Sequence, residues 1–415
     1  MDKISNLWNY LQAHNVEEAE LFKFDPGLFP GIAKCKEIKE TVRQRLSEIG
    51  NSLESLDRFS KAYEYYGFNF DANDNCYSFR EWLPGASEVY LTGDFNDWKN
   101  TQYPLSRNEF GVWEIKFDAS KFPFHEGDKY KLFLKNARGE FVYRNPAYTE
   151  RAVQDPNTKA FDASYVTRTK FQWKNSLPKS NDALKIYECH IGLSSEKEEV
   201  AQFSYFKDEV LPKIQELGYN TIQIMAVAEH AYYGSFGYHV TNFFAVSSRF
   251  GSIQAFKELI DAAHGLGILV FMDIVHSHAS SNALDGIGDM DGTDHLYFHS
   301  GAKGYHRDWD SRLFDYGKHE VLKFLLSNVR WWVEEFNIDG FRYDGVTCIL
   351  YKHHGKLIRN RLRVHRSPQR VLWRQLGCRC GCVFDTGSAG FGVDEKASDN
   401  NCRRRFLFPG NRSIN

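Results

Sequence analysis

The feature that most restricts the fold is a regular alternation of apolar runs and amphipathic stretches between residues 184 and 343. The apolar runs have the length of strands, and the stretches between them carry apolar residues at helical spacing. Buried strands that alternate with helices indicate a parallel sheet covered by helices. The predicted strands are Leu184–Ile191, Thr221–Val227, Ile268–Val275 and Ile338–Tyr343, and the predicted helices are Phe206–Leu217, Ile253–Leu266 and Glu320–Phe336.

The sequence before residue 184 has a different pattern of apolar and polar residues. Short alternating runs are separated there by turn residues such as Pro84-Gly85. Such regular spacing is typical of an all-β sandwich, which we place at residues 63–170. Helically spaced apolar residues predict an N-terminal helical segment over residues 1–62. The predicted strands of the sandwich include Ser78–Trp82, Val89–Thr92, Val112–Phe117, Tyr130–Phe133 and Phe141–Tyr143.

Composition narrows the class of protein. The 415 residues are 42% hydrophobic, which suffices for two or three domains with proper cores. With 52 Lys and Arg against 54 Asp and Glu, the chain as a whole lacks the excess of basic residues that is typical of nucleic-acid-binding proteins. No run of 18 apolar residues predicts a membrane span, and Met1–Leu11 lacks the features of a targeting segment. Scattered cysteines are typical of free thiols, so we expect a cytoplasmic monomer.

Polar residues follow the predicted parallel strands at their carboxyl ends. Asp273, His276 and His278 end the third strand, either as metal ligands or as hydrogen-bonding side chains. After the fourth strand, Arg342 and Asp344 alternate with apolar residues and so project to one face. An arginine this close keeps the carboxylate ionised, which suits a nucleophile; a structural ion pair is the alternative.

A third polar segment, Tyr238-His239-Val240-Thr241-Asn242, follows the second strand. Tyr238 has the ring needed to stack on a sugar, and aromatic content is 15% overall, although aromatic residues also fill cores. All these segments follow strand ends, which is where a (β/α)₈ barrel keeps its active site. No dinucleotide, P-loop or metalloprotease motif competes with this interpretation.

Four segments together carry a resemblance to a known family. They are Trp82–Trp98 with Gly-Asp-Phe-Asn-Asp-Trp, Tyr187–Gly192, Tyr238–Asn242 continuing to Arg249-Phe250-Gly251, and Gly340–Gly355. Over residues 1 to about 355 the chain resembles the 1,4-α-glucan branching enzymes of glycogen and starch synthesis, in glycoside hydrolase family 13. The resemblance implies a β-sandwich carbohydrate-binding module of family 48 followed by a (β/α)₈ TIM barrel.

The same resemblance assigns roles to residues. It makes Asp344 the nucleophile, Arg342 its ion-pair partner and Asp273 a support for that pair. His278 and Tyr238 become contacts to the sugar at the cleavage point. On the sandwich, the candidate glucan contacts are Trp82, Trp98 and Trp113. The implied partner is a glycogen-like or starch-like α-glucan, and neither a cofactor nor a metal is implied.

The implied reaction is a retaining glycosyl transfer. A carboxylate attacks the anomeric carbon of an α-1,4 linkage while a second carboxylic acid protonates the leaving oxygen, which gives a covalent glycosyl-enzyme. The 6-hydroxyl of another glucose then accepts the chain as an α-1,6 branch. Residue spacing by itself does not separate this transfer from hydrolysis.

The last 60 residues depart from this pattern. Residues 356–415 carry 13 basic and 4 acidic side chains, whereas the first 355 have a net charge of −11. No later barrel strand is predicted here, so residues 183–355 represent the first half of a barrel, with the fourth strand as an unpaired edge and a disordered tail behind it. The family's acid/base Glu is missing, and we expect this chain to be inactive or nearly so.

The tail permits several explanations. Suitable codons for Arg359–Val371, read one base later, spell a continuation similar to that of branching enzymes, which indicates a frame-shift. A misassembled gene model is a second explanation. A basic module with Cys378, Cys380, Cys382 and Cys402 as zinc ligands is a third, although zinc fingers favour two-residue gaps. For the whole chain, a glucan-binding protein without turnover is the alternative function.

Overall fold

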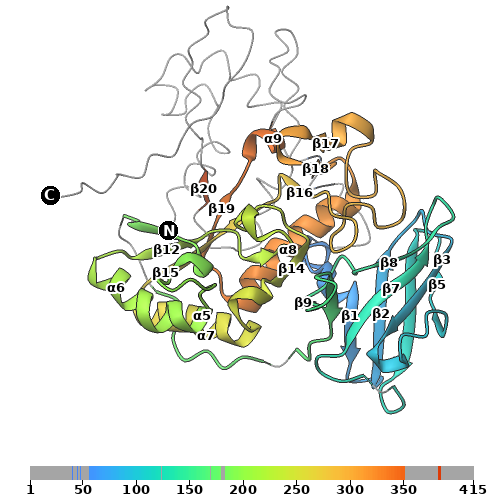
Figure 1. Cartoon of the computed structure of the whole chain (residues 1–415), viewed down its shortest axis with the longest axis horizontal. Helices are drawn as coiled ribbons and strands as arrows, with labels where there is room; N and C mark the ends of the chain where they lie inside the picture. Colours follow the sequence, from blue (N-terminus) through green and yellow to red (C-terminus); the bar gives the residue numbers. More distant parts are fainter. Residues whose placement is uncertain are drawn as a thin grey trace, which may run out of the picture. The chain divides into compact units, whose positions relative to one another are not determined.

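The computed structural model describes residues 56–122, 124–168, 170–178, 183–350 and 382–384, with the single positions 40, 44 and 47 (Figure 1). Most of the predicted N-terminal helical segment lies outside these residues. So do the predictions for the basic tail, namely disorder and the zinc alternative, apart from the backbone at 382–384.

Two antiparallel sheets form the predicted sandwich. The alternation that predicted it is visible in β7, where Tyr130, Leu132 and Leu134 are buried while Phe133 between them is partly exposed. The first sheet has the order β1 (Gly67–Asp71), β2 (Cys76–Trp82), β6 (Val112–Asp118), β5 (Ser106–Arg107). The second has the order β4 (Tyr103–Pro104), β3 (Glu88–Gly93), β7 (Lys129–Lys135), β10 (Phe161–Ser164), β9 (Ala152–Gln154), with β8 (Phe141–Arg144) paired to β7.

A parallel sheet follows, and all four strands predicted for it are present. All four residues of β12 are buried, as expected for a parallel strand covered on both faces. The sheet order is β11 (Ile186–Cys189), β12 (Thr221–Ile224), β15 (Leu269–Ile274), β19 (Gly340–Tyr343), β20 (Cys382–Phe384).

The strand β20 corrects one prediction. We expected β19 to be an unpaired edge, but residues Phe341 to Tyr343 pair in parallel with Cys382 to Phe384. The free backbone groups of an edge strand pair with any extended segment within reach, whatever its side chains. Three residues are too few to show strand periodicity in the sequence, so this pairing was missed.

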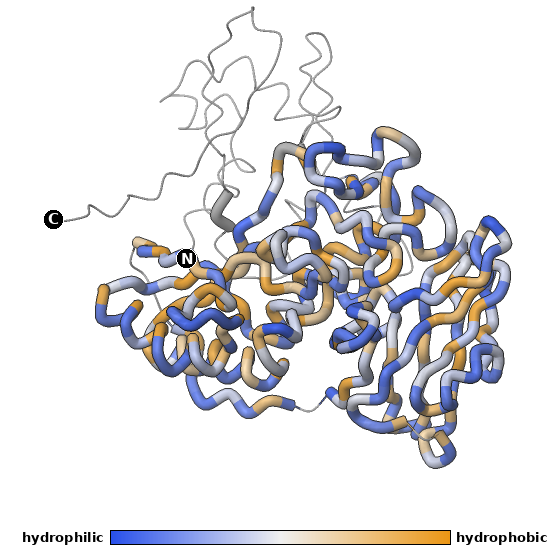
Figure 2. The backbone as a smooth tube through the Cα atoms, in the orientation of Figure 1, coloured by the Kyte–Doolittle hydropathy of each residue, from blue (hydrophilic) through white to orange (hydrophobic). Residues whose placement is uncertain are grey.

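The three predicted helices are present, and each has an apolar and a polar side. The first is continuous through α5 (Phe203–Tyr205), the π-turn η6 (Phe206–Val210) and α6 (Leu211–Glu216). Pro212 lies at the start of α6 and has no N–H to donate, which explains the widened turn before it. The others are α7 (Ile253–Gly265), capped by the Ser252 side chain, and α8 (His319–Phe336). Figure 2 shows orange and blue alternating along these helices.

The long segment between β15 and α8 contains a small sheet that the sequence did not predict. Its strands are β16 (His278–Ser280), β18 (Ser311–Leu313) and β17 (Tyr305–His306), paired antiparallel in that order. Another short pair is β13 (Ala228–Glu229) with β14 (Asn242–Val246). The remaining short elements are α4 (Leu56–Phe59), η3 (Ala62–Glu64), η4 (Asp94–Asn96), η5 (Ile191–Leu193), η7 (Tyr233–Ser235), η8 (Ser248–Phe250), η9 (Gly301–Gly304), η10 (Arg307–Trp309) and α9 (Val346–Leu350).

The core runs without interruption from the sandwich into the α/β region. Tyr148 stacks on Tyr66, with ring centroids 4.9 Å apart, and on Phe244, at 4.8 Å. Tyr66 precedes β1 while Phe244 lies in β14, so aromatic contacts join the two parts into one buried cluster. No helix in the part of the chain that the structure describes is long and apolar enough to cross a membrane.

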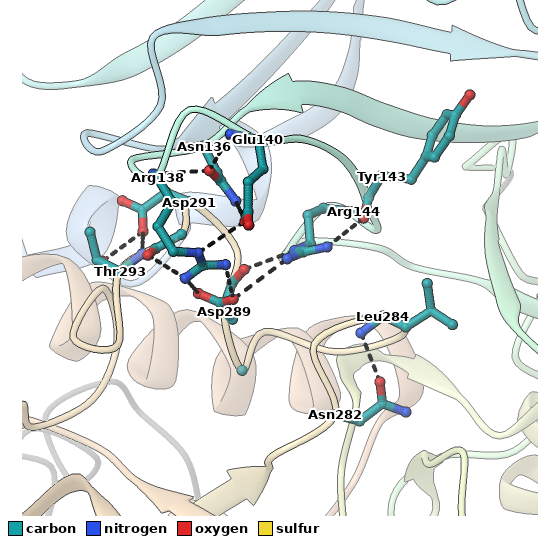
Figure 3. A network of polar contacts seen from close by, with 12 residues as sticks. Asn136, Arg138, Glu140, Tyr143, Arg144, Asn282, Leu284, Asp289, Asp291 and Thr293 are labelled. Carbon is teal, nitrogen blue, oxygen red and sulfur yellow. Dashed lines mark hydrogen bonds and ion pairs between the residues drawn. The ribbon is translucent and has the colours of Figure 1, made fainter. Parts of the chain in front are cut away.

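A polar network also joins the sandwich to the segment after β16 (Figure 3). Arg138 donates hydrogen bonds to Asp289 Oδ2 at 2.7 Å and to the carbonyl oxygen of Gly292 at 2.6 Å. Arg144 donates to the carbonyl oxygen of Asp289 at 2.8 Å. The backbone N–H of Gly85 donates to Asp291 Oδ2 at 2.9 Å. Two sandwich elements therefore hold residues 289–292 in place.

Candidate active site

The ends of two neighbouring parallel strands bring three charged side chains together. Asp273 on β15 pairs with Arg342 on β19 in the strand register, and Asp344 directly follows β19. Arg342 Nη1 donates a 3.0 Å hydrogen bond to Asp273 Oδ2 and another of 3.0 Å to Asp344 Oδ1. One guanidinium nitrogen thus bridges two carboxylates through charge-assisted hydrogen bonds.

The loop after β12 adds Tyr238 to this group. Its hydroxyl donates a 2.6 Å hydrogen bond to Asp273 Oδ2. Gly237 makes the approach possible, because its φ is +93° and a Cβ there would lie 1.9 Å from the carbonyl oxygen of Ala226. A tight turn that only glycine tolerates therefore brings Tyr238 to the strand ends.

His278 is held beside Tyr238 in a defined protonation state. Its Nε2 lies 2.9 Å from the carbonyl oxygen of Tyr238, and its Nδ1 lies 2.8 Å from the Ser277 hydroxyl. A carbonyl oxygen only accepts, so we assign the proton to Nε2, with Ser277 donating to Nδ1. Burial lowers the pKa of His278 to about 4. The imidazole is therefore neutral near pH 7 and offers no positive charge.

The two carboxylates that Arg342 bridges differ in how far they are buried. The Asp273 side chain is 0% exposed, whereas that of Asp344 is 21% exposed. Burial raises the pKa of Asp273 to about 7, opposed by the hydrogen bond from Tyr238 and the charge of Arg342. Burial also raises the pKa of the Tyr238 hydroxyl, and the nearby Asp273 adds to that effect. Of the two carboxyl groups, Asp344 is the one open to a ligand.

The metal alternative for His276 finds no geometric support. His276 Nε2 lies 2.8 Å from Asn328 Oδ1, and Asn328 Nδ2 donates to the carbonyl oxygen of Phe243 at 2.7 Å. His276 is fully buried and ties the end of β15 to α8 and β14. Within residues 56–350, short gaps aside, no three His, Cys, Asp or Glu side chains gather as metal ligands would.

The three candidate tryptophans belong to the sandwich and differ in exposure. Trp98 is partly exposed, with its Nε1 donating to Asp94 Oδ1 at 2.8 Å. Trp82 is half-buried and packs edge-on against Tyr297, at 5.7 Å between ring centroids.

Trp113 corrects a prediction, because it is only 6% exposed. Its indole N–H donates to the carbonyl oxygen of Leu83 at 2.9 Å, which satisfies the polar atom inside the core. The resemblance implied a glucan contact at Trp113, but Val112 and Trp113, adjacent on β6, are both buried. A glucan contact at Trp113 is therefore not supported.

Two residues near the site escaped the sequence analysis. Glu229 is fully buried and accepts hydrogen bonds from the Ser248 N–H at 2.7 Å and the Ser247 hydroxyl at 3.0 Å, which holds the loop before Tyr238. Trp309 lies beside His278, with ring centroids 5.2 Å apart. Neither residue stands in a recognisable motif. Trp309 nevertheless lies between two aspartates, and a tryptophan in such a polar segment is a signal that a search for sugar contacts would use.

Two family models match the chain in the two parts described above. Residues 65–157 match carbohydrate-binding module 48 (isoamylase N-terminal domain), and residues 208–299 match the catalytic domain of alpha amylase. Among solved structures, the Group B Streptococcus pullulanase SAP in complex with maltotetraose is similar with a TM-score of 0.62 and 18% identity, over 80% of this chain and 47% of that one. A likeness at this identity concerns the fold.

Closer relatives come from curated sequences. The 1,4-alpha-glucan-branching enzyme of Dictyostelium discoideum is 50% identical over 328 residues, which are 76% of this chain and 48% of that protein. The enzyme of the same name from Yarrowia lipolytica is 50% identical over 349 residues, 81% of this chain and 49% of that protein. The chain spans about half the length of the curated relatives it matches.

The fold and the strand-end site therefore define an α-amylase-type catalytic region preceded by a carbohydrate-binding module. Within that class, the identity of about 50% to the relatives above separates this chain from amylases and pullulanases. Over 76% to 81% of its length the chain is thus similar to 1,4-alpha-glucan-branching enzymes, at 50% identity.

Proposed function

We propose that this chain carries the nucleophile half of a branching-enzyme active site for α-1,4-linked glucan, with Asp344 as the attacking carboxylate, and that it is inactive or nearly so because the acid/base Glu is missing. One observation carries the proposal: Arg342 Nη1 lies 3.0 Å from both Asp273 and Asp344, at the carboxyl ends of β15 and β19. The arginine is thereby fixed by a fully buried carboxylate and holds the more exposed one in the orientation of a nucleophile. The names of the relatives specify a 1,4-alpha-glucan, and we propose a glycogen-like or starch-like polymer as the substrate.

In the proposed reaction, Asp344 attacks the anomeric carbon of a glucose unit, and the bond from that carbon to the leaving oxygen breaks. The leaving oxygen takes a proton, and the new ester joins Asp344 to the sugar. A glucose 6-hydroxyl then attacks the same carbon, loses its proton and releases the carboxylate. Tyr238 and the neutral His278 are proposed to contact the sugar at that position.

Proton donation to the leaving oxygen needs a second carboxylic acid about 5 Å from the nucleophile. Asp273 is a poor candidate, because it is fully buried and bound by both Tyr238 and Arg342. Elsewhere in residues 56–350 we assign no side chain to this role. This observation favours a second candidate function, glucan binding without turnover.

The decisive experiment compares the full chain with its Asp344→Asn variant on linear amylose. Branching lowers the iodine stain of amylose and creates α-1,6 linkages, which isoamylase digestion detects. The full chain is expected to show little or no branching, and any activity that it has is expected to fall on the order of 10³-fold or more in the variant, because the nucleophile is removed. Asp208→Asn, an exposed aspartate on the first helix of the α/β region, serves as the control and retains activity.

The other outcomes separate the two functions. A chain that is retained in a glycogen gel but makes no α-1,6 linkage has the binding function, whereas measurable α-1,6 transfer contradicts the expected inactivity. Full activity in Asp344→Asn contradicts the assignment of the nucleophile.

We also infer a cytoplasmic, monomeric protein. The support for the cytoplasm is that two described cysteines, Cys76 and Cys189, are free thiols. Light scattering during gel filtration checks the monomer, and imaging of a tagged chain checks the location.

A further inference from the structure

Trp309 is an exposed tryptophan next to the candidate active site. It ends the short helix η10 (Arg307–Trp309) in the turn between β17 and β18, and 39% of its surface is accessible. An indole this open offers apolar surface on which a ligand with an apolar face can pack.

Hydrogen bonds and a ring stack within the protein fix the conformation of the turn that carries Trp309. Asp310 adopts the left-handed conformation at φ +45°, and its carboxylate accepts hydrogen bonds from the Tyr305 hydroxyl and the Ser281 hydroxyl. The His306 ring stacks on Trp309 at 4.1 Å between centroids and 11° between planes. The stack covers one face of the indole and fixes its orientation, which reduces the entropy lost on binding.

The ring also lies close to the reacting groups. Its centroid is 5.2 Å from that of His278, which is tilted by 47°. A Cβ on Gly345 would lie 3.6 Å from Trp309 Cζ3, and Gly345 directly follows Asp344. The indole is thus placed beside the sugar position that His278 and Asp344 define.

We propose that Trp309 is a stacking platform for the glucose unit next to the one that Asp344 attacks. The C–H face of a glucose ring packs on the open surface of the indole, while the sugar hydroxyls remain free for directional hydrogen bonds. The inference rests on the proposed α-glucan site and adds the residue that fixes the position of the neighbouring sugar.

The test measures binding rather than turnover, so that it stands apart from the activity assay. The full chain with Asp344→Asn is labelled with 5-fluorotryptophan, and its ¹⁹F spectrum is recorded during titration with maltoheptaose. The chain has nine tryptophans, and the Trp309 resonance is the one that Trp309→Phe removes. The expected result is a saturable shift of the Trp309 resonance, while that of the buried Trp332 does not move.

Two variants make the result specific. Trp309→Ala is expected to weaken maltoheptaose binding at this site by about three- to tenfold, and Trp309→Phe by less, because phenylalanine keeps a smaller ring. His306→Ala tests the support of the ring and is expected to give an intermediate loss. An unchanged ¹⁹F spectrum of the other tryptophans in each variant shows that the fold is intact.

The proposal is overturned if maltoheptaose shifts Trp98 on the sandwich and leaves Trp309 unmoved, or if no tryptophan shifts at saturating maltoheptaose. A Trp309 shift in a chain that makes no branch points upholds the platform and counts only against the branching activity.

Discussion

At the scale of single residues, burial outweighs charge in setting the properties of the carboxyl groups. Asp273 keeps a raised pKa of about 7 although Arg342 and the Tyr238 hydroxyl both favour its ionised form. Glu81 reaches the same value of about 7 by burial, opposed only by the backbone N–H groups of Ala147 and Trp82. Transfer of a carboxylate out of water is costly enough that a few hydrogen bonds do not restore its ordinary pKa.

Glu81 gives a clean test of this cost. Its carboxyl has an ordinary pKa of 4.5 in an unfolded chain and about 7 when buried, so the folded state binds the proton more tightly. The free energy of unfolding therefore falls as pH rises from about 4.5 to 7, by about 3 kcal/mol for this group. Glu81→Gln removes this slope, and urea unfolding at a series of pH values measures it.

The control for this prediction is Glu109→Gln, an exposed glutamate of the same sandwich, which is expected to keep the wild-type slope. Equal slopes in wild type and Glu81→Gln would contradict the raised pKa of Glu81. A loss of stability in Glu81→Gln that is the same at every pH does not contradict it, because the amide NH2 of glutamine would face one of the two backbone N–H donors that the carboxyl oxygens accept from.

A second prediction concerns the support of the candidate site by Gly237. A side chain at φ +93° is strained, and a Cβ there would lie 1.9 Å from the carbonyl oxygen of Ala226. Gly237→Ala is expected to displace Tyr238 and weaken glucan binding at the Trp309 site, while the remote sandwich keeps its fold. The ¹⁹F titration measures glucan binding at the Trp309 site, and an unchanged Trp98 resonance shows that the sandwich is intact. Wild-type binding together with an undisplaced Tyr238 loop in Gly237→Ala would contradict the prediction.

At the scale of elements, the ion pairs between the sandwich and the segment after β16 differ in how far they are buried. Arg144 and Arg138 both reach Asp289, but the Arg144 side chain is 8% exposed while that of Arg138 is 47% exposed (Figure 3). Exposed pairs are worth about 0–1 kcal/mol, whereas removal of one partner from a buried pair costs about 3–5 kcal/mol.

We therefore expect Arg144→Ala to destabilise the chain more than Arg138→Ala, by roughly 2 kcal/mol or more. Urea unfolding gives the totals, and hydrogen exchange of residues 285–293 shows whether this loop loosens first. Lys99→Ala, which removes an exposed pair with Asp97, is the matched control and is expected to change little. Equal losses in the free energy of unfolding for Arg138→Ala and Arg144→Ala would show that burial does not decide how much each contact contributes to stability.

At the scale of the whole molecule, the matches to relatives cover only part of the chain. The listed relatives match 74% to 82% of this chain, and the frame-shift hypothesis for residues after 355 stays a prediction. Sequencing of genomic DNA and transcript across codons 350 to 360 is expected to reveal an insertion, a deletion or an altered splice junction there. Agreement of both with the present frame would end the hypothesis.

The elements that the sequence predicted are those with a long local signal. The four parallel strands, the three helices between them and five sandwich strands, β2, β3, β6, β7 and β8, were predicted because their apolar patterns extend over several residues. The sandwich strands β1, β4, β5, β9 and β10 were not predicted. The small sheets β16–β18–β17 and β13–β14 were missed because strands of two or three residues carry almost no periodicity. The strand β20 was missed because pairing with β19 depends on residues about 40 positions away.

The sequence by itself determined the order of strands and helices, the position of Asp273, Arg342 and Asp344 at strand ends, and the family. These follow from local patterns and from motifs that survive in the linear chain. Only the tertiary structure decided that Arg342 bridges both carboxylates, that Asp273 is buried while Asp344 is open, that Trp113 lies in the core, and that Trp309 stands beside His278. Distances and exposure depend on which segments meet in space, and no local pattern specifies that.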